Sequence, residues 1–542
     1  MNGLMMELHP TITSIMQFAD KVYPNTEIVS VTGDNPRHRC SYADVFRRTR
    51  KLANALSKLG LARGDRVGTL AWNDFRHLEL YYGISCSGFV CHTINPRLFS
   101  EQIEYIINHA EDRYIFLDPM FVQLLEPLQD RLPGVEGFIV MSDKANMPDT
   151  TLRGCRSYEE LIECESDAFS WPELCESEAS ALCYTSGTTG HPKGVLYSHR
   201  STVAHAYASC LPDALCLSHS DVVMPVVPMF HVNAWGLPYS TVMTGSKVIF
   251  PGPKMGDGET LAALINEERV SVSAGVPTVW LALLNYLEKS GKSLESLQRV
   301  VVGGAACPLS IMESFEKTYN VYTHAAWGMT EMSPLGTFNS RLDRQALGEE
   351  MYAKMRLKAG RPIYGVEMKI VDEDNRELPW DGNAFGALKV RGPWVCREYF
   401  KHHDSDAHDA EGWFDTGDVA TIDVWGYMQI TDRSKDVIKS GGEWISSIEL
   451  ENIAANHPAV VEAAVIGVYH PKWTERPLLM VIKNEDVELT QAQMLEWFKD
   501  RVAPWWVPDE VVFVDSLPHT ATGKLDKKSL RDQFSDYRFV AD

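Results

Sequence analysis

The spacing of apolar residues predicts alternating helices and strands along most of the chain. The apolar side chains of residues 44–59 share one face of a helix, and Gly60 is suited to end it. Residues 66–71, 178–184 and 300–302 are short apolar runs of the kind that form buried strands. The last two runs end in glycine-containing turns, as parallel strands commonly do at a ligand-binding edge. This alternation predicts an α/β fold.

A change in composition near residue 432 predicts a domain boundary. Residues 426–431 read as a short strand, and the highly charged run 432–436 follows it. The chain would then consist of a large multi-subdomain α/β domain at 1–431, a hinge at 432–435 and a small mobile α+β lid at 436–542. Within the lid we expect helices at 448–456 and 490–501 and strands at 460–468, 477–483 and 510–514.

The charge and the cysteine content narrow the class of protein. The formal net charge of −22 disfavours non-specific binding to nucleic acid or to anionic lipid. The 11 cysteines include no CxxC pair, which is typical of reduced thiols in a cytoplasmic protein. Residues 1–20 do not resemble a signal peptide, and no apolar run of about 18 residues predicts a membrane span.

A glycine-rich loop occupies residues 184–194, with the sequence Tyr-Thr-Ser-Gly-Thr-Thr-Gly-His-Pro-Lys-Gly. Its glycines allow backbone N–H groups to turn toward an anion, its hydroxyls add donors, and Lys193 adds a positive charge. The loop differs from that of P-loop nucleoside triphosphatases, because Lys193 follows a proline and precedes a glycine. The alternative interpretation is a flexible surface turn. We predict a polyphosphate cradle formed by Thr185, Ser186, Gly187, Thr188, Thr189, Gly190 and Lys193.

Six further strings occur along the chain, at residues 224–236, 303–308, 327–331, 412–418, 432–443 and 520–524. Together with the loop they resemble the adenylate-forming superfamily, which contains acyl-CoA synthetases, luciferases and the adenylation domains of peptide synthetases. The resemblance is strongest to bacterial medium-chain acyl-CoA synthetases and methylmercaptopropionate-CoA ligases. It implies an enzyme that uses ATP to convert a carboxylic acid to an acyl-adenylate and then passes the acyl group to coenzyme A, releasing AMP and pyrophosphate.

The resemblance also implies how the strings bind Mg-ATP. Charge moves to the leaving pyrophosphate, so cations and hydrogen-bond donors are needed around the phosphates. Glu331 and Thr185 are the candidate Mg²⁺ ligands, and Asp418 is expected to accept both ribose hydroxyls. The alternatives are an exposed turn acid for Glu331 and a surface ion pair for Asp418. The other nucleotide-binding candidates are Gly303, Gly304, Ala305, Trp327, Gly328, Met329, Thr330 and Arg433.

The lid is implied to serve both half-reactions by rotating about the hinge. Lys524 would be the catalytic lysine of adenylation, bridging the substrate carboxylate and the α-phosphate. Lys435 aligns with the hinge position, and Lys439 would act in the second conformation. Gly441 and Gly442 would then allow a close approach of the pantetheine arm.

The acyl pocket is expected next to residues 224–236. If this segment is helical, His231 and Trp235 share a face, and the indole could shorten the cavity. His231 is a candidate for catalysis or for gating the pocket. The alternative, of equal weight, is a buried histidine whose hydrogen bonds serve the fold alone. Amino-acid-activating relatives have an aspartate shortly after the equivalent of Phe230, and this chain has none there. The substrate-binding candidates are His231, Trp235, Val276, Pro277, Gly303 and Pro334.

The resulting hypothesis is an acyl-CoA ligase for a short- or medium-chain apolar acid, with 3-methylmercaptopropionate as the specific candidate. An acyl-AMP ligase that loads a carrier protein and a non-catalytic acyl or nucleotide sensor stay open. The presence of both Glu331 and Lys524 disfavours the sensor. Assembly as a homodimer is an expectation from the family.

Replacing Lys524 with alanine should separate the two half-reactions. We expect the Lys524→Ala variant to lose acyl-adenylate formation, because the repulsion between carboxylate and α-phosphate is no longer offset. The same variant should still transfer the acyl group from a preformed adenylate to the thiol. Pyrophosphate exchange and single-turnover thioester formation measure the two steps, and an equal loss of both would contradict this role.

Overall fold

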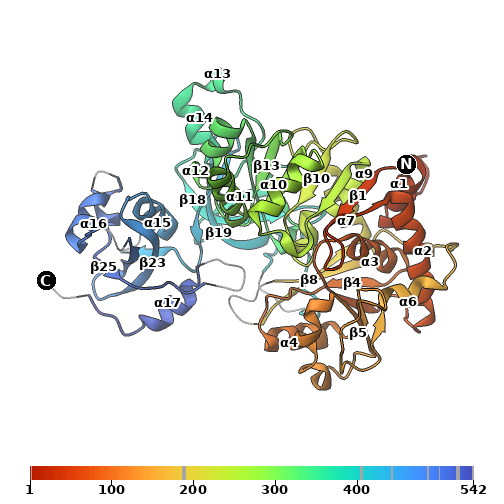
Figure 1. Cartoon of the computed structure of the whole chain (residues 1–542). Coiled ribbons are helices and arrows are strands. Elements are labelled where there is room, and N and C mark those ends of the chain that lie inside the picture. Colours follow the sequence, from red (N-terminus) through yellow and green to blue (C-terminus); the bar gives the residue numbers. More distant parts are fainter. Residues whose placement is uncertain are drawn as a thin grey trace. The chain divides into compact units, whose positions relative to one another are not determined.

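The computed structural model describes residues 1, 3–185, 191–402, 407–440, 443–484, 487–499, 501–519 and 525–539. These residues form two compact units, which Figure 1 colours along the chain. Unit 1 contains the described residues of 1–185, 191–367 and 391–408. Unit 2 contains the described residues of 368–390 and 409–542.

The larger sheet of unit 1 has nine strands in the order β16-β15-β14-β13-β12-β10-β11-β1-β2. The run from β14 to β1 is parallel, and antiparallel pairs complete both edges. Parallel strands end at the same edge of a sheet, so the segments that follow β13 and β14 lie side by side. The strands are β1 (Glu27–Ser30), β2 (His38–Ser41), β10 (Val222–Pro225), β11 (Lys247–Phe250), β12 (Val272–Gly275), β13 (Arg299–Val302), β14 (Tyr322–Gly328), β15 (Leu335–Phe338) and β16 (Arg361–Pro362).

The second sheet of unit 1 has seven strands in the order β7-β6-β5-β3-β4-β8-β9. Its pairs are parallel except for the last, in which β8 and β9 run antiparallel on either side of the glycine-rich loop. The strands are β3 (Arg66–Leu70), β4 (Val90–Thr93), β5 (Asp112–Leu117), β6 (Gly137–Val140), β7 (Arg156–Ser157), β8 (Ala179–Tyr184) and β9 (Gly194–Ser198).

Helices cover these sheets and complete two apolar cores (Figure 1). Helix α2 has the expected capping box between Ser41 and Asp44, and every residue of α3 is buried. The helices of unit 1 are α1 (Ile12–Val22), α2 (Tyr42–Lys58), α3 (Phe75–Cys86), α4 (Ser100–Ala110), α5 (Val122–Leu125), α6 (Tyr158–Glu163), α7 (His199–Ser209), α8 (Val232–Trp235), α9 (Leu237–Thr244), α10 (Gly258–Glu267), α11 (Pro277–Ser290), α12 (Leu309–Glu313), α13 (Arg344–Leu347) and α14 (Glu349–Arg356).

Unit 2 contains two sheets. One has the order β17-β18-β19-β20. The other has the order β22-β21-β24-β23, and β25 also pairs with β24, in parallel. The strands are β17 (Glu367–Val371, which starts at the last residue of a unit 1 segment), β18 (Phe385–Arg391), β19 (Phe414–Ile422), β20 (Met428–Arg433), β21 (Ile438–Ser440), β22 (Glu443–Ile445), β23 (Val460–His470), β24 (Thr474–Lys483) and β25 (Glu510–Phe513). The helices are α15 (Ser447–Ala455), α16 (Gln491–Phe498) and α17 (Lys527–Gln533).

The expected α/β fold class is confirmed, with a large α/β unit and a smaller unit that combines sheets and helices. The five elements expected within 436–542 also occur, as α15, α16, β23, β24 and β25. The domain bounds themselves stay a prediction. β20 runs through Asp432 and Arg433, the first two residues of the expected hinge.

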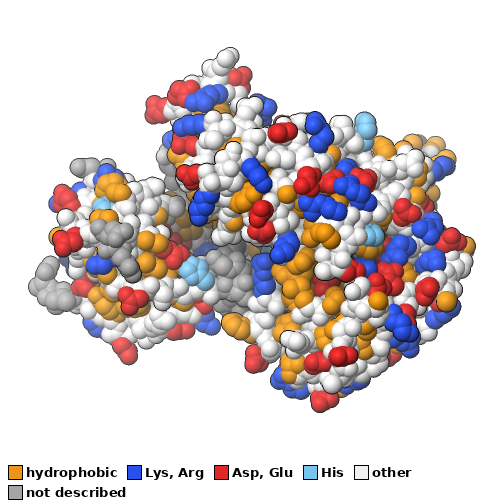
Figure 2. All heavy atoms as spheres, in the orientation of Figure 1, with side chains coloured by type: hydrophobic (Ala, Val, Ile, Leu, Met, Phe, Trp, Pro, Cys, Tyr) orange, Lys and Arg blue, Asp and Glu red, His pale blue; other side chains and the backbone are white. Residues whose placement is uncertain are grey.

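The visible surface mixes acidic and basic side chains rather than gathering one charge into a single large patch (Figure 2). In the part of the chain that the structure describes, no helix is long and apolar enough to cross a membrane.

Candidate active site

The two ends of the glycine-rich loop bond to each other at the end of the β8–β9 hairpin. The Thr185 backbone N–H donates to the Lys193 carbonyl at 2.9 Å, and the Lys193 N–H donates to Thr185 Oγ1 at 3.0 Å. Lys193 Nζ lies 4.7 Å from the centre of the Tyr399 ring. The hairpin therefore brings Thr185 and Lys193 together. The other predicted cradle residues, Ser186, Gly187, Thr188, Thr189 and Gly190, lie outside the described residues.

Glu331 is held in a buried position after β14. It is 7% exposed, its Oε1 accepts from the Tyr399 hydroxyl at 2.7 Å, and its carbonyl accepts from the Cys396 N–H at 2.7 Å. Tyr197 of β9 donates its hydroxyl to the carbonyl of the adjacent Thr330 at 2.6 Å. The exposed-turn alternative for Glu331 is therefore wrong. Tyr399 contacts both Glu331 and Lys193, so two predicted phosphate-site residues meet at one tyrosine.

Burial, with the neighbouring Glu331 carboxylate, raises the pKa of Tyr399 well above its ordinary value. The hydroxyl thus keeps its proton and remains a donor to Glu331 at neutral pH. Sequence reasoning missed Tyr399 and Tyr197, because neither occurs in a string that the resemblance assigns to ATP.

The residues proposed for Mg²⁺ fit that ion in chemical type. Mg²⁺ prefers oxygen donors and takes few of them from protein, with phosphate and water supplying the rest. Glu331 offers a carboxylate and Thr185 a hydroxyl. Among the described residues there is no group of three or more His, Cys, Asp or Glu side chains able to hold a metal.

The segment after β13 lies beside the end of β14, since a Cβ on Gly303 would lie 3.2 Å from the Ala326 carbonyl oxygen. Gly304 has a φ of +77° and is exposed, and Ala305 is exposed beside it. Trp327 is half-buried, and its ring lies directly on Gly336, where an added Cβ would come within 2.5 Å of Cζ3. This packing leaves part of the indole at the surface, as a stacking platform requires.

Three further predicted residues lie close together at the end of β14. Met329 N–H donates to the Pro334 carbonyl at 3.1 Å. A Cβ on Gly328 would lie 2.1 Å from the same carbonyl oxygen, so only glycine fits there. Thus Gly328, Met329 and Pro334 form one tight turn.

Several acyl-pocket candidates also come together. A Cβ added to Gly303 would lie 2.9 Å from Trp235 Cη2, so the indole covers Gly303 directly. A Cβ on Gly304 would lie 3.2 Å from Val276 Cγ1, just before Pro277 starts α11. His231 is half-buried, and its backbone N–H donates to the Pro228 carbonyl at 3.0 Å. The described contacts assign it no particular chemistry.

The segment after His231 is not an ordinary helix. Val232, Asn233, Ala234 and Trp235 have φ values of +46°, +51°, +48° and +57°, which makes α8 a left-handed turn. The segment is therefore not the helix on which His231 and Trp235 would share a face. A left-handed conformation costs an L-residue about 1–2 kcal/mol, so other contacts must hold this turn.

In unit 2, the predicted ribose-binding acid is paired with a predicted neighbour. Asp418 and Arg433 are cross-strand partners on β19 and β20, and Arg433 Nε lies 2.8 Å from Asp418 Oδ1. The Asp418 side chain is 3% exposed and that of Arg433 is 50% exposed. The surface ion pair that was the alternative is therefore only half correct, because Arg433 is exposed and Asp418 is buried.

The remaining lid candidates are only partly described. Lys435 is exposed. Lys439 is exposed on β21, 3.8 Å from Glu373 Oε1 and 5.6 Å from the centre of the Trp444 ring. Lys524, Gly441 and Gly442 lie outside the described residues.

A buried polar cluster in unit 2 was not expected from the sequence. Lys527 Nζ lies 2.7 Å from Glu451 Oε1 and donates to Ser447 Oγ at 2.6 Å. Ser447 Oγ in turn donates to Asp432 Oδ1 at 3.0 Å. Burial raises the pKa of Asp432 and of Glu451, and the Lys527 ammonium opposes that rise. We call Asp432, Ser447, Glu451 and Lys527 the Lys527 cluster.

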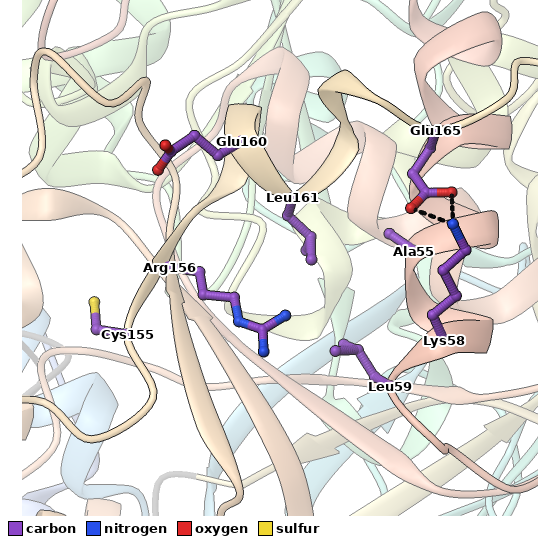
Figure 3. Close-up of a pocket in the computed structure, with 8 residues that line it drawn as sticks. All are labelled: Ala55, Lys58, Leu59, Cys155, Arg156, Glu160, Leu161 and Glu165. Carbon is purple, nitrogen blue, oxygen red and sulfur yellow. Dashed lines mark hydrogen bonds and ion pairs between the residues drawn. The ribbon is translucent and has the colours of Figure 1, made fainter.

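A separate surface pocket of about 350 Å³ lies between the end of α2 and α6 (Figure 3). Lys58 and Glu165 form an ion pair of 2.7 Å at its rim. None of the predicted site residues belongs to its lining, which consists of Ala55, Lys58, Leu59, Cys155, Arg156, Glu160, Leu161 and Glu165.

Comparison with known proteins shows to which family the chain is similar. Residues 17–400 match the AMP-binding enzyme family, and residues 449–524 match the AMP-binding enzyme C-terminal domain. The chain is 53% identical to a 3-methylmercaptopropionyl-CoA ligase of Ruegeria lacuscaerulensis, over 99% of each chain. It is 49% identical to a medium-chain-fatty-acid–CoA ligase of Ectopseudomonas oleovorans, over 99% of this chain and 98% of the relative. An anthranilate CoA ligase solved with anthranoyl-AMP has a TM-score of 0.84 at 25% identity, over 98% of each chain.

Removing the cation of the Lys527 cluster should destabilise unit 2. The Lys527→Met variant leaves two buried carboxylates without their ammonium partner, which typically costs about 3–5 kcal/mol. Hydrogen exchange measured by mass spectrometry should become faster in α15 and α17. Lys528→Met, at an exposed neighbouring position, is the matched control and should leave exchange unchanged.

The loss of stability caused by Lys527→Met should become smaller as the pH falls. The folded-state pKa values of Asp432 and Glu451 are already raised, and loss of the ammonium raises them further. The Lys527→Met variant therefore keeps its stability at pH values where both acids are protonated. It loses that stability as the pH rises through the folded-state pKa values of the two acids. Equal exchange in wild type and variant at neutral pH would contradict a stabilising role for the cluster.

Proposed function

We propose that this chain, which belongs to the AMP-binding enzyme family, ligates a short- or medium-chain apolar carboxylic acid to coenzyme A. It is an ATP-dependent acid–CoA ligase, like the relatives that share its full length. The structural observation that carries the proposal is the meeting of Lys193 and Glu331 on Tyr399 at the base of the glycine-rich loop. A cation and a buried acid fixed beside a hydroxyl-rich loop suit a metal–triphosphate complex.

The proposed nucleotide site uses the residues that the sequence singled out. Thr185, Lys193 and the loop 186–190 bind the phosphates, and Glu331 with Thr185 holds Mg²⁺, which neutralises and orients phosphate oxygens when bound. The backbone after β13 and the Trp327 ring bind adenine, supported by the exposure of Gly304 and Ala305 and the half-buried position of Trp327. Asp418 accepts the ribose hydroxyls, and its ion pair with Arg433 fixes the position of the carboxylate.

The chemistry asked of these residues is mainly electrostatic. The carboxylate of the substrate attacks the α-phosphorus, an acyl–phosphate bond forms, and the bond to pyrophosphate breaks. Lys193 and the loop donors stabilise charge that builds on the leaving group, and Lys524 offsets the repulsion between the two anions. In the second step the thiol of coenzyme A attacks the acyl carbon, and AMP leaves.

The acyl class is proposed from the pocket and from the relatives. Trp235, Val276 and Gly303 form an apolar wall, and the Trp235 indole limits its depth at Gly303. The matched relatives act on 3-methylmercaptopropionate and on medium-chain fatty acids by name. A thioether chain and a short alkyl chain make similar contacts, because each methylene contributes only about 1 kcal/mol. We therefore propose 3-methylmercaptopropionate and butyrate through octanoate as candidate substrates.

The movement of the lid belongs to the same proposal. Residues 436–542 would rotate about 432–435, so that Lys524 serves adenylation and Lys439, with Gly441 and Gly442, serves the thiol step. The charged run at 432–436 and the exposed Lys435 support a hinge there. A homodimer and a cytoplasmic location are proposed from the family resemblance.

A thiol-dependent AMP-release assay tests the function directly. Butyrate, hexanoate, octanoate and 3-methylmercaptopropionate would each be supplied with ATP, and coenzyme A would be compared with a pantetheinylated carrier protein. We expect AMP release with coenzyme A. We also expect that the acid with the highest kcat/KM is one of these four. Release only with the carrier protein would establish the acyl-AMP ligase alternative, and no release with any acid would overturn the enzyme.

Tyr399→Phe tests the proposed metal ligand. The variant removes the hydroxyl that orients Glu331, so the apparent affinity for Mg²⁺ in the adenylation step should fall about tenfold or more. Tyr364→Phe is the matched control, since Tyr364 is 88% exposed, and it should not change the magnesium dependence. An unchanged Mg²⁺ titration in Tyr399→Phe would argue that Glu331 does not hold the metal.

A further inference from the structure

We propose that Asn233 is a positioning residue that holds the left-handed turn of α8 and thereby sets the length of acyl chain the enzyme accepts. The inference rests on the proposed function, because it assigns acyl selectivity to the wall formed by Trp235. Asn233 does not touch the reacting atoms in this account. It acts through the neighbouring indole.

The turn needs a dedicated support because its residues do not favour it. Val232, Ala234 and Trp235 are L-residues with a Cβ that crowds the backbone when φ is positive, and valine is β-branched. Asparagine is the residue type among the four that adopts this conformation most readily. Asn233 therefore occupies the one position at which the sequence favours the observed backbone.

The side chain of Asn233 is anchored to two different elements. It is 5% exposed, and its Oδ1 lies 3.2 Å from the Tyr81 hydroxyl of α3 and accepts from Cys183 Sγ of β8 at 3.2 Å. Cys183 also lies 3.0 Å from Thr93 Oγ1. Burial raises the pKa of the Cys183 thiol to about 11, so it remains a donor at neutral pH. The turn is thus bonded to a fully buried helix and to the strand that leads into the phosphate loop.

The chain that enters the turn is fixed by a second buried amide. Asn73 is fully buried, and its Nδ2 donates to the carbonyls of Pro225 at 3.1 Å and Val227 at 2.8 Å. Its Oδ1 accepts from the Met229 N–H at 2.6 Å. The Tyr81 hydroxyl also contacts the Met229 carbonyl. The approach to α8 therefore has little freedom to shift.

The chain that leaves the turn is equally confined. Gly236 has a φ of +76°, and a Cβ there would lie 2.7 Å from the His205 ring. The Nε2 atom of His205 accepts from the Leu335 N–H at 3.2 Å, next to Pro334 of the proposed pocket. With both ends fixed, the position of the Trp235 indole on Gly303 depends on the conformation of the turn between them.

Loss of the Asn233 anchor should therefore change the selectivity for acyl-chain length and not the reaction that the enzyme catalyses. If the turn relaxes toward negative φ, the direction of the Trp235 side chain changes and the cover over Gly303 is lost. A longer acyl chain then finds space that the indole occupies in the wild type. A short acid makes no additional contacts in that space, so its kcat/KM falls relative to that of the longer acid.

The experiment measures kcat/KM for butyrate and octanoate in the wild type, Asn233→Ala and Asn233→Gly. Asn233→Ala loses both the anchor and the tolerance of positive φ, whereas Asn233→Gly loses the anchor alone. We expect the octanoate-to-butyrate ratio to rise about tenfold in Asn233→Ala and less in Asn233→Gly. Asn320→Ala is the matched control, because Asn320 is an exposed asparagine with a φ of +54°.

A merely structural role would lower kcat/KM for both acids by the same factor and leave the ratio unchanged, and that result would overturn the inference. Tyr81→Phe supplies a milder change that removes one hydroxyl, and it decides the outcome if Asn233→Ala does not fold. An unchanged ratio in Tyr81→Phe would then count against the proposal. Failure of the wild type to release AMP with either acid would instead overturn the proposed function.

Discussion

The antiparallel pairing of β8 with β9 is the constraint on which the site in unit 1 depends. It closes the glycine-rich loop at its base, where Thr185 and Lys193 bond to each other. The same hairpin extends to the surrounding segments, since Cys183 of β8 bonds to Asn233 and Tyr197 of β9 bonds to Thr330. A shift in the register of this one pair would therefore displace the ends of the glycine-rich loop, the left-handed turn and the segment of Glu331 together.

Tyrosines perform much of the orientation around this hairpin. Tyr81, Tyr197 and Tyr399 each direct a hydroxyl onto a functional segment while their rings stay packed. A neutral donor fixes a carboxylate such as Glu331 without adding a positive charge beside it. Burial keeps these hydroxyls protonated, because it raises the pKa of each of the three tyrosines. These three hydroxyls therefore remain hydrogen-bond donors in the neutral pH range.

Much of the fold follows from local patterns in the sequence. The amphipathic face of α2, the apolar runs of β8 and β13 and the elements of the lid all appear where periodicity predicts them. The left-handed turn could not be predicted, since Val232, Ala234 and Trp235 carry no local signal for positive φ and the contacts that hold it come from distant strands and helices. Asn233 is the only one of the four residues whose type favours a positive φ, and asparagine also occurs in many other backbone conformations.

The site residues divide in the same way. Residues within conspicuous strings, such as Lys193, Glu331 and Asp418, could be proposed from the sequence because their chemistry recurs in a family. Tyr399 and Lys527 could not, because their roles depend on partners that lie far away along the chain. These are Glu331 for Tyr399, and Ser447 and Glu451 for Lys527. Tertiary contacts of this kind leave no trace in spacing or composition.

The Lys527 cluster has a consequence for how the lid can turn. Asp432 precedes the exposed Lys435, whereas Ser447, Glu451 and Lys527 follow it, and Ser446 Oγ also donates to the Thr431 carbonyl. If the proposed lid turns at Lys435, Asp432 has to separate from Ser447, so the buried cluster opposes that rotation. If the proposed rotation occurs, the free energy needed to break these hydrogen bonds contributes to the barrier between the two lid orientations.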